Sequence, residues 1–257
     1  MDKDVMAEFE TDGGTVAQGT IHGVGLGPGN PDLMSVRADR LVRNARHIAF
    51  FRKAGRSGQA RRIVNGMLHP DAVEHAMEYP VTTEIPVSDP RYNQILSAFY
   101  TECTAHLTAL SAKGEDVVVL CEGDPFFYGS FMHLHSRLAG IAPVKIVPAI
   151  TGMSAAWTAT DMPVTWGDDV LTVLAGTLPE DVMTARMKDA DAVVVMKLGR
   201  TFDKVVRALK AAGRFDDAWL IQHAAMPDET VARLSEVHEK PTPYFSIVVV
   251  HGQGRRP

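Results

Sequence analysis

The chain has 257 residues, of which 46% are apolar and 22% are charged, with a formal net charge of −5. This is the composition of a globular protein, and the negative charge argues against a dedicated nucleic-acid binder. The longest apolar runs, such as Val117–Cys121, have the length of a strand, so no membrane partner is expected and the cytoplasm is the expected compartment.

Short apolar runs alternate with longer amphipathic ones, which is typical of an α/β architecture. Residues 1–18 are polar and acidic and are predicted to form a disordered tail. Ser35 is expected to cap a helix that runs to about Arg46, with an inner face of Val36, Leu41, Val42 and Ala45. The other elements predicted in this half are strands at 19–26, 48–51, 117–121 and 144–147, helices at 59–67, 90–113 and 131–138, and an extended stretch at 81–87.

The alternation restarts after Pro148, so we place a domain junction near residues 141–148. This gives an N-terminal α/β domain over 19–145 and a C-terminal α/β domain over 146–257. The elements predicted in the second domain are helices at 153–160, 180–187 and 201–211 and strands at 170–174, 192–196, 218–221 and 246–250. Cys103 and Cys121 match neither a disulfide framework nor a metal-site spacing.

A glycine-rich turn, Gly23-Val24-Gly25-Leu26-Gly27-Pro28-Gly29, follows the first predicted strand. Glycines at a strand-to-helix turn let a ligand approach the backbone. The dinucleotide-binding spacing G-x-G-x-x-G would need glycine at position 28 or 30, and these positions hold Pro28 and Asn30. A ligand loop and a simple tight turn are both consistent with this motif.

A second loop, Glu-Gly-Asp-Pro-Phe-Phe-Tyr-Gly-Ser at 122–130, follows the strand at 117–121. Ligands of open parallel sheets bind beyond the carboxyl ends of the strands. The two carboxylates of this loop suit a cationic or hydroxyl-bearing ligand, and its three aromatic rings suit a flat one. A third segment, Pro148–Ala156, runs from a strand into a helix of small residues, which permits close approach of a cofactor or of another helix. No metal site is expected, because His133 and His135 point apart on a helix.

The order of these motifs resembles that of the tetrapyrrole methylases. Three further segments extend the resemblance to about residues 19–251: Met196–Arg200, Ala225–Glu229 and Pro243–Ser246. The stretch Cys-Glu-Gly-Asp-Pro-Phe-Phe-Tyr-Gly-Ser-Phe, together with Ala175–Pro179, is most similar to the branch of the family that methylates precorrin-2 at C(20).

The resemblance implies a two-domain α/β fold, usually a homodimer, with S-adenosyl-L-methionine bound in the cleft between the domains and S-adenosyl-L-homocysteine as its product. The cofactor-binding residues that it implies are Pro28, Gly123, Asp124, Phe127, Thr151, Gly152, Leu174, Ala175, Met196 and Ala224. The family usually has Pro-Gly where this chain has Pro148-Ala149, so Ala149 is not carried over. No catalytic base is identified.

The implied tetrapyrrole substrate carries eight carboxylates, which arginines bind well. The basic residues that we expect to meet them are Arg52, Lys53, Arg56, Arg61 and Arg62. The earlier series Arg37, Arg40, Arg43 and Arg46 is interpreted instead as a solvated helix face.

The resulting hypothesis is methylation of precorrin-2 at C(20), giving precorrin-3A, in cobalamin biosynthesis. Methylation of cobalt-factor II or of another corrin intermediate is the nearest alternative. A nicotinamide-dependent oxidoreductase is disfavoured by the glycine spacing and by the basic stretch where a ribose-binding acid would lie. A tetrapyrrole carrier without methyl turnover is the third possibility.

Overall fold

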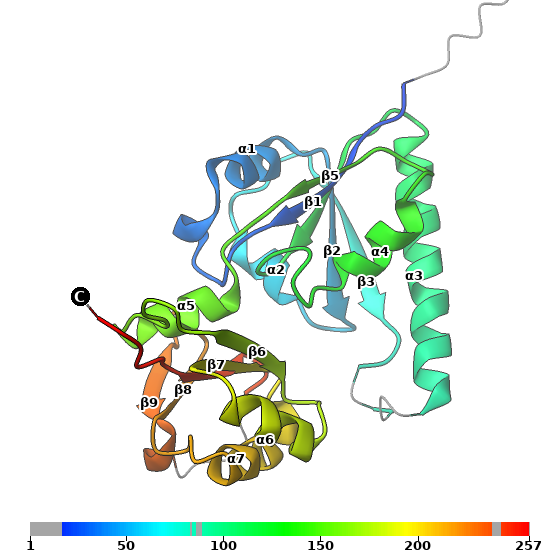
Figure 1. The fold of residues 1–257 in the computed structure, drawn as a ribbon. Coiled ribbons are helices and arrows are strands. Elements are labelled where there is room, and N and C mark those ends of the chain that lie inside the picture. Colours follow the sequence, from blue (N-terminus) through cyan, green and yellow to red (C-terminus); the bar gives the residue numbers. More distant parts are fainter. Residues whose placement is uncertain (1–16, 83, 86–88, 238–242, 257) are drawn as a thin grey trace, which may run out of the picture.

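Two five-stranded sheets organise the chain, as the computed structural model in Figure 1 shows. The structure describes residues 17–82, 84–85, 89–237 and 243–256. The first half contains β1 (Ile21–Gly25), η1 (Pro31–Leu33), α1 (Val36–Asn44), β2 (His47–Lys53), α2 (Gln59–Ile63), β3 (Val73–Tyr79), α3 (Pro90–Ser111), β4 (Val117–Cys121), α4 (Phe131–Leu138) and β5 (Val144–Val147). The second half contains α5 (Gly152–Ala159), β6 (Leu171–Ala175), α6 (Glu180–Lys188), β7 (Ala192–Met196), η2 (Gly199–Thr201), α7 (Phe202–Ala211), β8 (Ala218–Gln222), β9 (Thr230–Arg233), η3 (Leu234–Glu236) and β10 (Ser246–Val250).

The first sheet is parallel throughout and has the strand order β3-β2-β4-β1-β5. Its central strand β4, Val-Val-Val-Leu-Cys, is buried along its whole length, as expected for a strand covered on both faces. Residues of α1 and α2 pack on one face of the sheet, and those of α3 and α4 pack on the other. After β1 the chain continues to β2, which lies toward the β3 edge of the sheet, whereas after β4 it continues to β5, which forms the opposite edge. The carboxyl ends of β1 and β4 therefore flank a topological switch point, where such sheets bind ligands.

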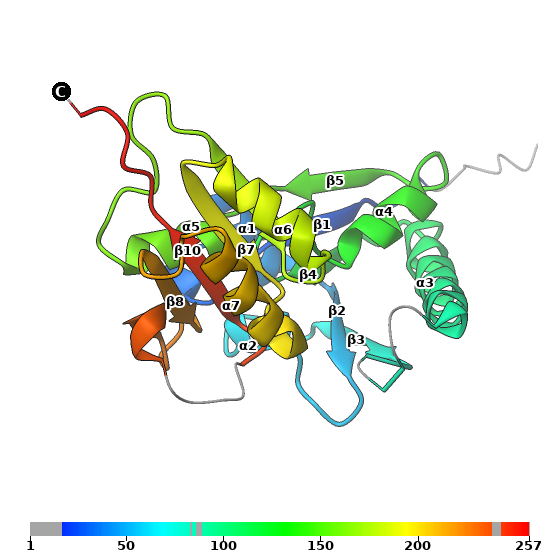
Figure 2. The same ribbon diagram turned by 60° about the horizontal axis from the view of Figure 1, so that its bottom comes forward.

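The second sheet is mixed and has the order β6-β7-β10-β8-β9. Only β6 and β7 run parallel, and β10 pairs antiparallel with both β7 and β8. Residues of α6 and α7 bury one face of the sheet, and those of α5 bury the other. Figure 2 shows α6 and α7 in front of β7 and β10.

Several expected elements differ from the structure. The edge strand β3 was not predicted, and neither was the short β9; the extended stretch expected at 81–87 forms no strand in its described residues. Val36, expected on the inner face of its helix, is 75% exposed. It precedes the buried Ala38 by two residues, about 200° around the helix, and so points away from the sheet. Helix α2 ends at Ile63 rather than near Met67, before the left-handed Gly66.

The tail expected at residues 1–18 lies almost wholly outside the described residues. Within the described part, none of the helices has the length and apolar character needed to cross a membrane.

Candidate functional site

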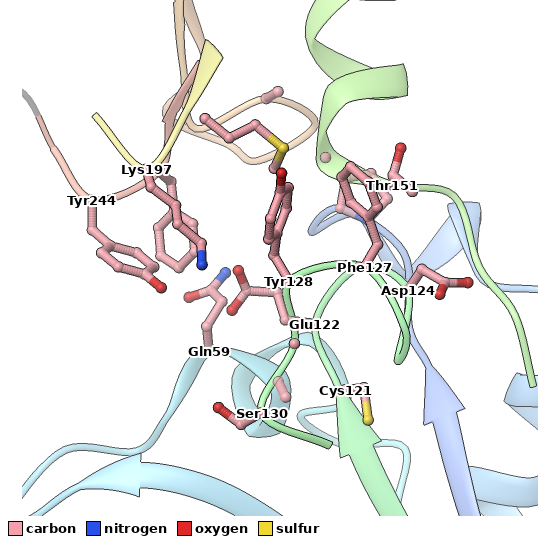
Figure 3. A pocket seen from close by; sticks show the side chains of 18 of the residues that line it. Gln59, Cys121, Glu122, Asp124, Phe127, Tyr128, Ser130, Thr151, Lys197 and Tyr244 are labelled. Carbon is pink, nitrogen blue, oxygen red and sulfur yellow. The ribbon is translucent and has the colours of Figure 1, made fainter. Parts of the chain in front are cut away.

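A cavity of about 310 Å³ opens at the carboxyl ends of β1 and β4 and takes its lining from both halves of the chain. From the first half come the end of β4 and the loop that follows it, together with Pro28 after β1. From the second half come the end of β7, the start of β10 and the loop after β8. Figure 3 shows side chains from these segments converging on one space.

Hydrogen bonds fasten together the three loops of the first sheet that border the cavity. The amide of Gly123 donates to the carbonyl of Gly27 at 2.8 Å, which joins the loops after β4 and β1. One carboxylate oxygen of Asp124 accepts from the Phe126 amide at 2.9 Å, and the other accepts from the Ala149 amide at 3.0 Å. Asp124 therefore shapes its own loop and ties it to the loop after β5.

Gly25 lies where these three loops meet. A Cβ atom at this position would lie 2.6 Å from the Ala149 Cβ, 2.8 Å from the Gly123 carbonyl oxygen and 2.9 Å from the Pro125 Cδ. Because such separations are far below van der Waals contact, only glycine lets the loops pack this closely.

The third loop leads into α5, whose first turn faces the cavity. Thr151 is the N-cap of this helix, and its hydroxyl accepts a hydrogen bond from the Ser154 amide. Both Thr151 and Gly152 line the cavity. The N-terminus of a helix attracts negative charge, so this corner suits a carboxylate.

The second half contributes a mainly apolar wall, which includes Met196, Ile221, Ala224, Met226 and Ile247. The loop after β8 also reaches the first half. A Cβ atom added to Gly29 would lie 2.6 Å from the Met226 Cγ, and the Gln59 amide approaches the Met226 sulfur at 3.5 Å. The two halves are therefore in contact beside the cavity.

Backbone strain is concentrated around this cleft. Tyr128 and Lys197, which line the cavity, have φ values of 56° and 58°. His223 and Ala225, which line an adjoining hollow, have φ values of 52° and 59°. L-residues other than glycine rarely adopt such angles, and binding sites are where they collect.

A contact between a cation and an aromatic ring spans the cavity mouth. The Lys197 ammonium, carried by the loop after β7, lies 4.6 Å from the centroid of the Tyr128 ring, carried by the loop after β4. A lysine over an aromatic face is attracted by the negative charge of the ring face. This contact is a second connection between the halves.

Glu122 directly follows the central strand β4 and lines the cavity. In Figure 3 its carboxylate points into the cavity near Gln59 and Tyr128. Burial raises the pKa of the Glu122 carboxyl to about 7, and the positive charge of Arg62 opposes that shift. Removal from water disfavours the charged form of an acid, so this carboxyl titrates near neutral pH.

Cys121 and Tyr79 also line the cavity. Burial raises the pKa of the Cys121 thiol above its usual range, and it does the same for the hydroxyl of Tyr79. The Tyr79 hydroxyl also shares a short hydrogen bond with Ser130. These groups stay protonated at neutral pH.

The structure brings most of the predicted cofactor residues together. Those that line the cavity are Pro28, Gly123, Asp124, Phe127, Thr151, Gly152, Met196 and Ala224. Leu174 instead packs in the core between the second sheet and α6 and α7. Ala175 pairs with Met196 across β6 and β7, which places it beside the cavity wall rather than in its lining.

The basic residues expected to bind substrate lie around β2 and α2, and several already have acidic partners. Arg52 pairs with Glu78, Lys53 with Glu84, and Arg61 with Glu74. Arg62 contacts Gln59 and lines the adjoining hollow, and Arg56 is exposed in the loop after β2. The series Arg37, Arg40, Arg43 and Arg46 is exposed on and just after α1.

Several lining residues were not singled out from the sequence, among them Phe51, Gln59, Tyr79, Lys197, Tyr244 and Phe245. Lys197, Tyr244 and Phe245 lie within segments that carried the family resemblance, and this was the available signal. Gln59, at the start of α2, had none.

Comparison with known proteins gives one family and close relatives. Residues 20–237 match the family model for tetrapyrrole (corrin/porphyrin) methylases. A precorrin-2 C(20)-methyltransferase from Sinorhizobium sp is 45% identical over 242 residues, covering 94% of this chain and 99% of that protein. A cobalt-precorrin-2 C(20)-methyltransferase from Salmonella typhimurium is 28% identical over 240 residues, covering 91% of this chain and 97% of that protein.

Solved structures share the fold. The crystal structure of the methyltransferase CobJ matches with a TM-score of 0.68 at 18% identity, covering 93% of this chain and 97% of that one. A uroporphyrin-III C-methyl transferase from Thermus thermophilus, complexed with S-adenosyl homocysteine, matches with a TM-score of 0.64 at 21% identity, covering 90% and 96%. Both likenesses confirm the predicted α/β architecture.

Proposed function

The chain belongs to the tetrapyrrole (corrin/porphyrin) methylases, and on that basis we propose that it transfers a methyl group from S-adenosyl-L-methionine to C(20) of precorrin-2, giving precorrin-3A in cobalamin biosynthesis. The observation that carries this proposal is the relative from Sinorhizobium, which is 45% identical over almost the whole of both chains and is named for this reaction. The relative named for the cobalt-containing substrate is 28% identical, which favours the metal-free substrate.

The cavity fits S-adenosyl-L-methionine. Its apolar wall, with Met196, Ala224 and Ile247, suits an adenosine, and the N-terminus of α5 at Thr151 suits the carboxylate of the amino-acid portion. When bound, the cofactor supplies a sulfonium methyl group. We propose that the lining residues Pro28, Gly123, Asp124, Phe127, Thr151, Gly152, Met196 and Ala224 hold it, with Leu174 and Ala175 supporting the wall from β6.

The protein contributes mainly alignment and exclusion of water. Methyl transfer needs the acceptor carbon in line with the bond that breaks, so rigid loops around the cofactor provide much of the acceleration. The hydrogen bonds of Asp124 and the close packing at Gly25 supply that rigidity before any ligand arrives.

Of the basic residues around β2 and α2, Arg62 lines the hollow that adjoins the cavity. We propose that Arg62 meets the substrate carboxylates together with Arg52, Lys53, Arg56 and Arg61. For Arg52, Lys53 and Arg61 this requires exchange with Glu78, Glu84 and Glu74. Each of these ion pairs is partly exposed to water, which screens it, so the exchange costs little. We also propose a domain division near residue 146, a homodimer, and a cytoplasmic location.

The proposed function is tested by incubating the protein with S-adenosyl-L-methionine and precorrin-2 and following product mass. Gain of a single methyl group, located at C(20) by NMR, is the expected result. Parallel reactions with cobalt-factor II compare the two substrates. No methyl gain on either substrate would refute the assignment, and stabilisation against heat by NADH rather than by S-adenosyl-L-homocysteine would favour an oxidoreductase.

A further inference from the structure

We propose that Glu122 is the catalytic base that accepts the proton lost from C(20) after the methyl group has been transferred. The inference rests on the proposed function and adds a residue role to it. As the bond from C(20) to the methyl carbon forms, the methyl–sulfur bond breaks and its electron pair stays on sulfur. The C(20)–H bond then breaks, its electron pair returns to the macrocycle, and its proton goes to a carboxylate oxygen of Glu122.

The position of Glu122 in the fold suits this role. Glu122 follows the last residue of β4, the central strand of the parallel sheet, at the switch point beside β1. Its carboxylate points into the cavity in Figure 3, on the same loop as Gly123 and Asp124, which we assign to the cofactor. A base at this place borders the space that we assign to the cofactor.

The Glu122 carboxylate is also available to accept a proton. Among the residues that the structure describes, none donates a hydrogen bond to the Glu122 carboxylate or pairs with it as an ion at close range. Asp124, two residues further on, has both oxygens occupied by backbone amides. The half-buried Glu122 carboxylate therefore has oxygens that can accept a proton from a ligand in the cavity.

The basicity of the Glu122 carboxylate suits this role as well. A base must be deprotonated at the working pH and still bind a proton well, which favours a pKa near neutrality. Burial brings the Glu122 carboxyl to this range, with a pKa of about 7. The groups that face it are Arg62 on α2, Lys197 after β7, Tyr128 on its own loop and Tyr244 before β10.

The test compares Glu122→Gln with the wild type, using precorrin-2 with hydrogen or deuterium at C(20). The glutamine variant keeps the size of the side chain but cannot accept the proton as a carboxylate does. We expect kcat to fall about 100- to 10,000-fold, the range supplied by general base catalysis. We also expect a primary isotope effect on product formation, because loss of the proton becomes the slow step. Glu122→Asp should show an intermediate rate.

Two readouts separate a base from a merely structural residue. In the wild type, kcat should fall below a pKa near 7, and this limb should be absent in Glu122→Gln. The carboxyl ¹³C signal that the substitution removes should titrate near pH 7 in the protein without substrate. Binding of S-adenosyl-L-homocysteine should change less than about threefold in Glu122→Gln, and Glu102→Gln, on the exposed face of α3, should behave as the wild type in every assay.

Retention of more than a tenth of the wild-type kcat by Glu122→Gln, with an unchanged pH profile, would overturn the inference. Loss of S-adenosyl-L-homocysteine binding in that variant would also overturn it, because Glu122 would then be positioning the cofactor. Failure of the wild type to methylate precorrin-2 is a separate result, which refutes the proposed function itself.

Discussion

The two hydrogen bonds of Asp124 predict a measurable link between loop order and cofactor affinity. Replacing Asp124 with Asn changes one carboxylate oxygen into an NH2 group. Whichever way the new amide turns, one of the two backbone amides, of Phe126 or of Ala149, then faces a donor instead of an acceptor. Either the hydrogen bond within the loop after β4 or the hydrogen bond from Asp124 to the loop after β5 is then lost.

The size of the effect follows from the bond that is lost. An amide left without its acceptor costs about 1–3 kcal/mol, so we take about 2 kcal/mol. If cofactor binding must restore the closed arrangement, the Kd for S-adenosyl-L-homocysteine rises up to about 30-fold, since 1.4 kcal/mol corresponds to a factor of ten. If the chain unfolds as one unit, the same loss lowers its melting temperature by about 4–8 °C, at about 2–4 °C per kcal/mol for a protein of this length.

Titration calorimetry and thermal unfolding measure both quantities. The matched control is Asp89→Asn, because Asp89 also accepts a backbone amide bond, from Arg91 at 2.9 Å, but at the start of α3 and not in the cavity lining. That variant should lose some stability and keep its affinity. Wild-type affinity and melting temperature in Asp124→Asn would show that these bonds do not hold the cofactor loops.

Three other substitutions test separate parts of the site. Gly25→Ala places a methyl group within 2.6–2.9 Å of three atoms on the loops after β4 and β5 and should destabilise the fold by about 1–3 kcal/mol in urea unfolding; a wild-type midpoint would mean that these loops move apart at no cost. Glu122 has a pKa of about 7 in the folded state, against an ordinary value of 4.5. Between these two pH values the folded state binds more protons than the unfolded state. The free energy of unfolding of the wild type should therefore fall as the pH rises from 4.5 to 7, by at most about 3 kcal/mol. Glu122→Gln should therefore gain stability relative to the wild type between pH 5 and pH 8, and an equal difference at the two pH values would contradict the assigned pKa. Lys197→Met removes the contact with Tyr128 across the cleft and should weaken S-adenosyl-L-homocysteine binding about two- to fivefold, whereas tighter binding would show that the contact does not help to close the cleft.

The elements that the sequence predicted well are those whose local signals agree with their final environment. β4 is a continuous apolar run and is fully buried, and Ser35 caps α1 as its position suggested. β3, Val-Glu-His-Ala-Met-Glu-Tyr, lies at the edge of the first sheet with much of its surface exposed. Its polar residues break the apolar pattern from which a strand would be predicted. Edge strands carry weak hydrophobic patterns because only part of their surface is covered.

Some parts of the candidate site could likewise be predicted from local sequence signals, and others could not. The loops at Pro28, Gly123 and Thr151 follow strands, and their glycines and prolines are visible in the sequence, so their convergence was predictable from topology. Lys197 and Tyr128 meet only because the two halves fold against each other, and no local pattern encodes that contact. Among the described residues none donates a hydrogen bond to the Glu122 carboxylate, and no local pattern predicts this, since it depends on how distant side chains pack.

The place of β10 in the second sheet has a consequence for biosynthesis. This strand lies between β7 and β8, although it comes after all the other described strands in the sequence. Domains fold as units while the ribosome adds roughly 5–20 residues per second. The first sheet has all its strands once Val147 has emerged, whereas the second lacks its middle until residues 246–250 leave the exit tunnel. Because residues 244–247 also line the cavity, the nascent chain cannot close its binding site, or be stabilised by a ligand there, until these residues have emerged and β10 has joined the sheet.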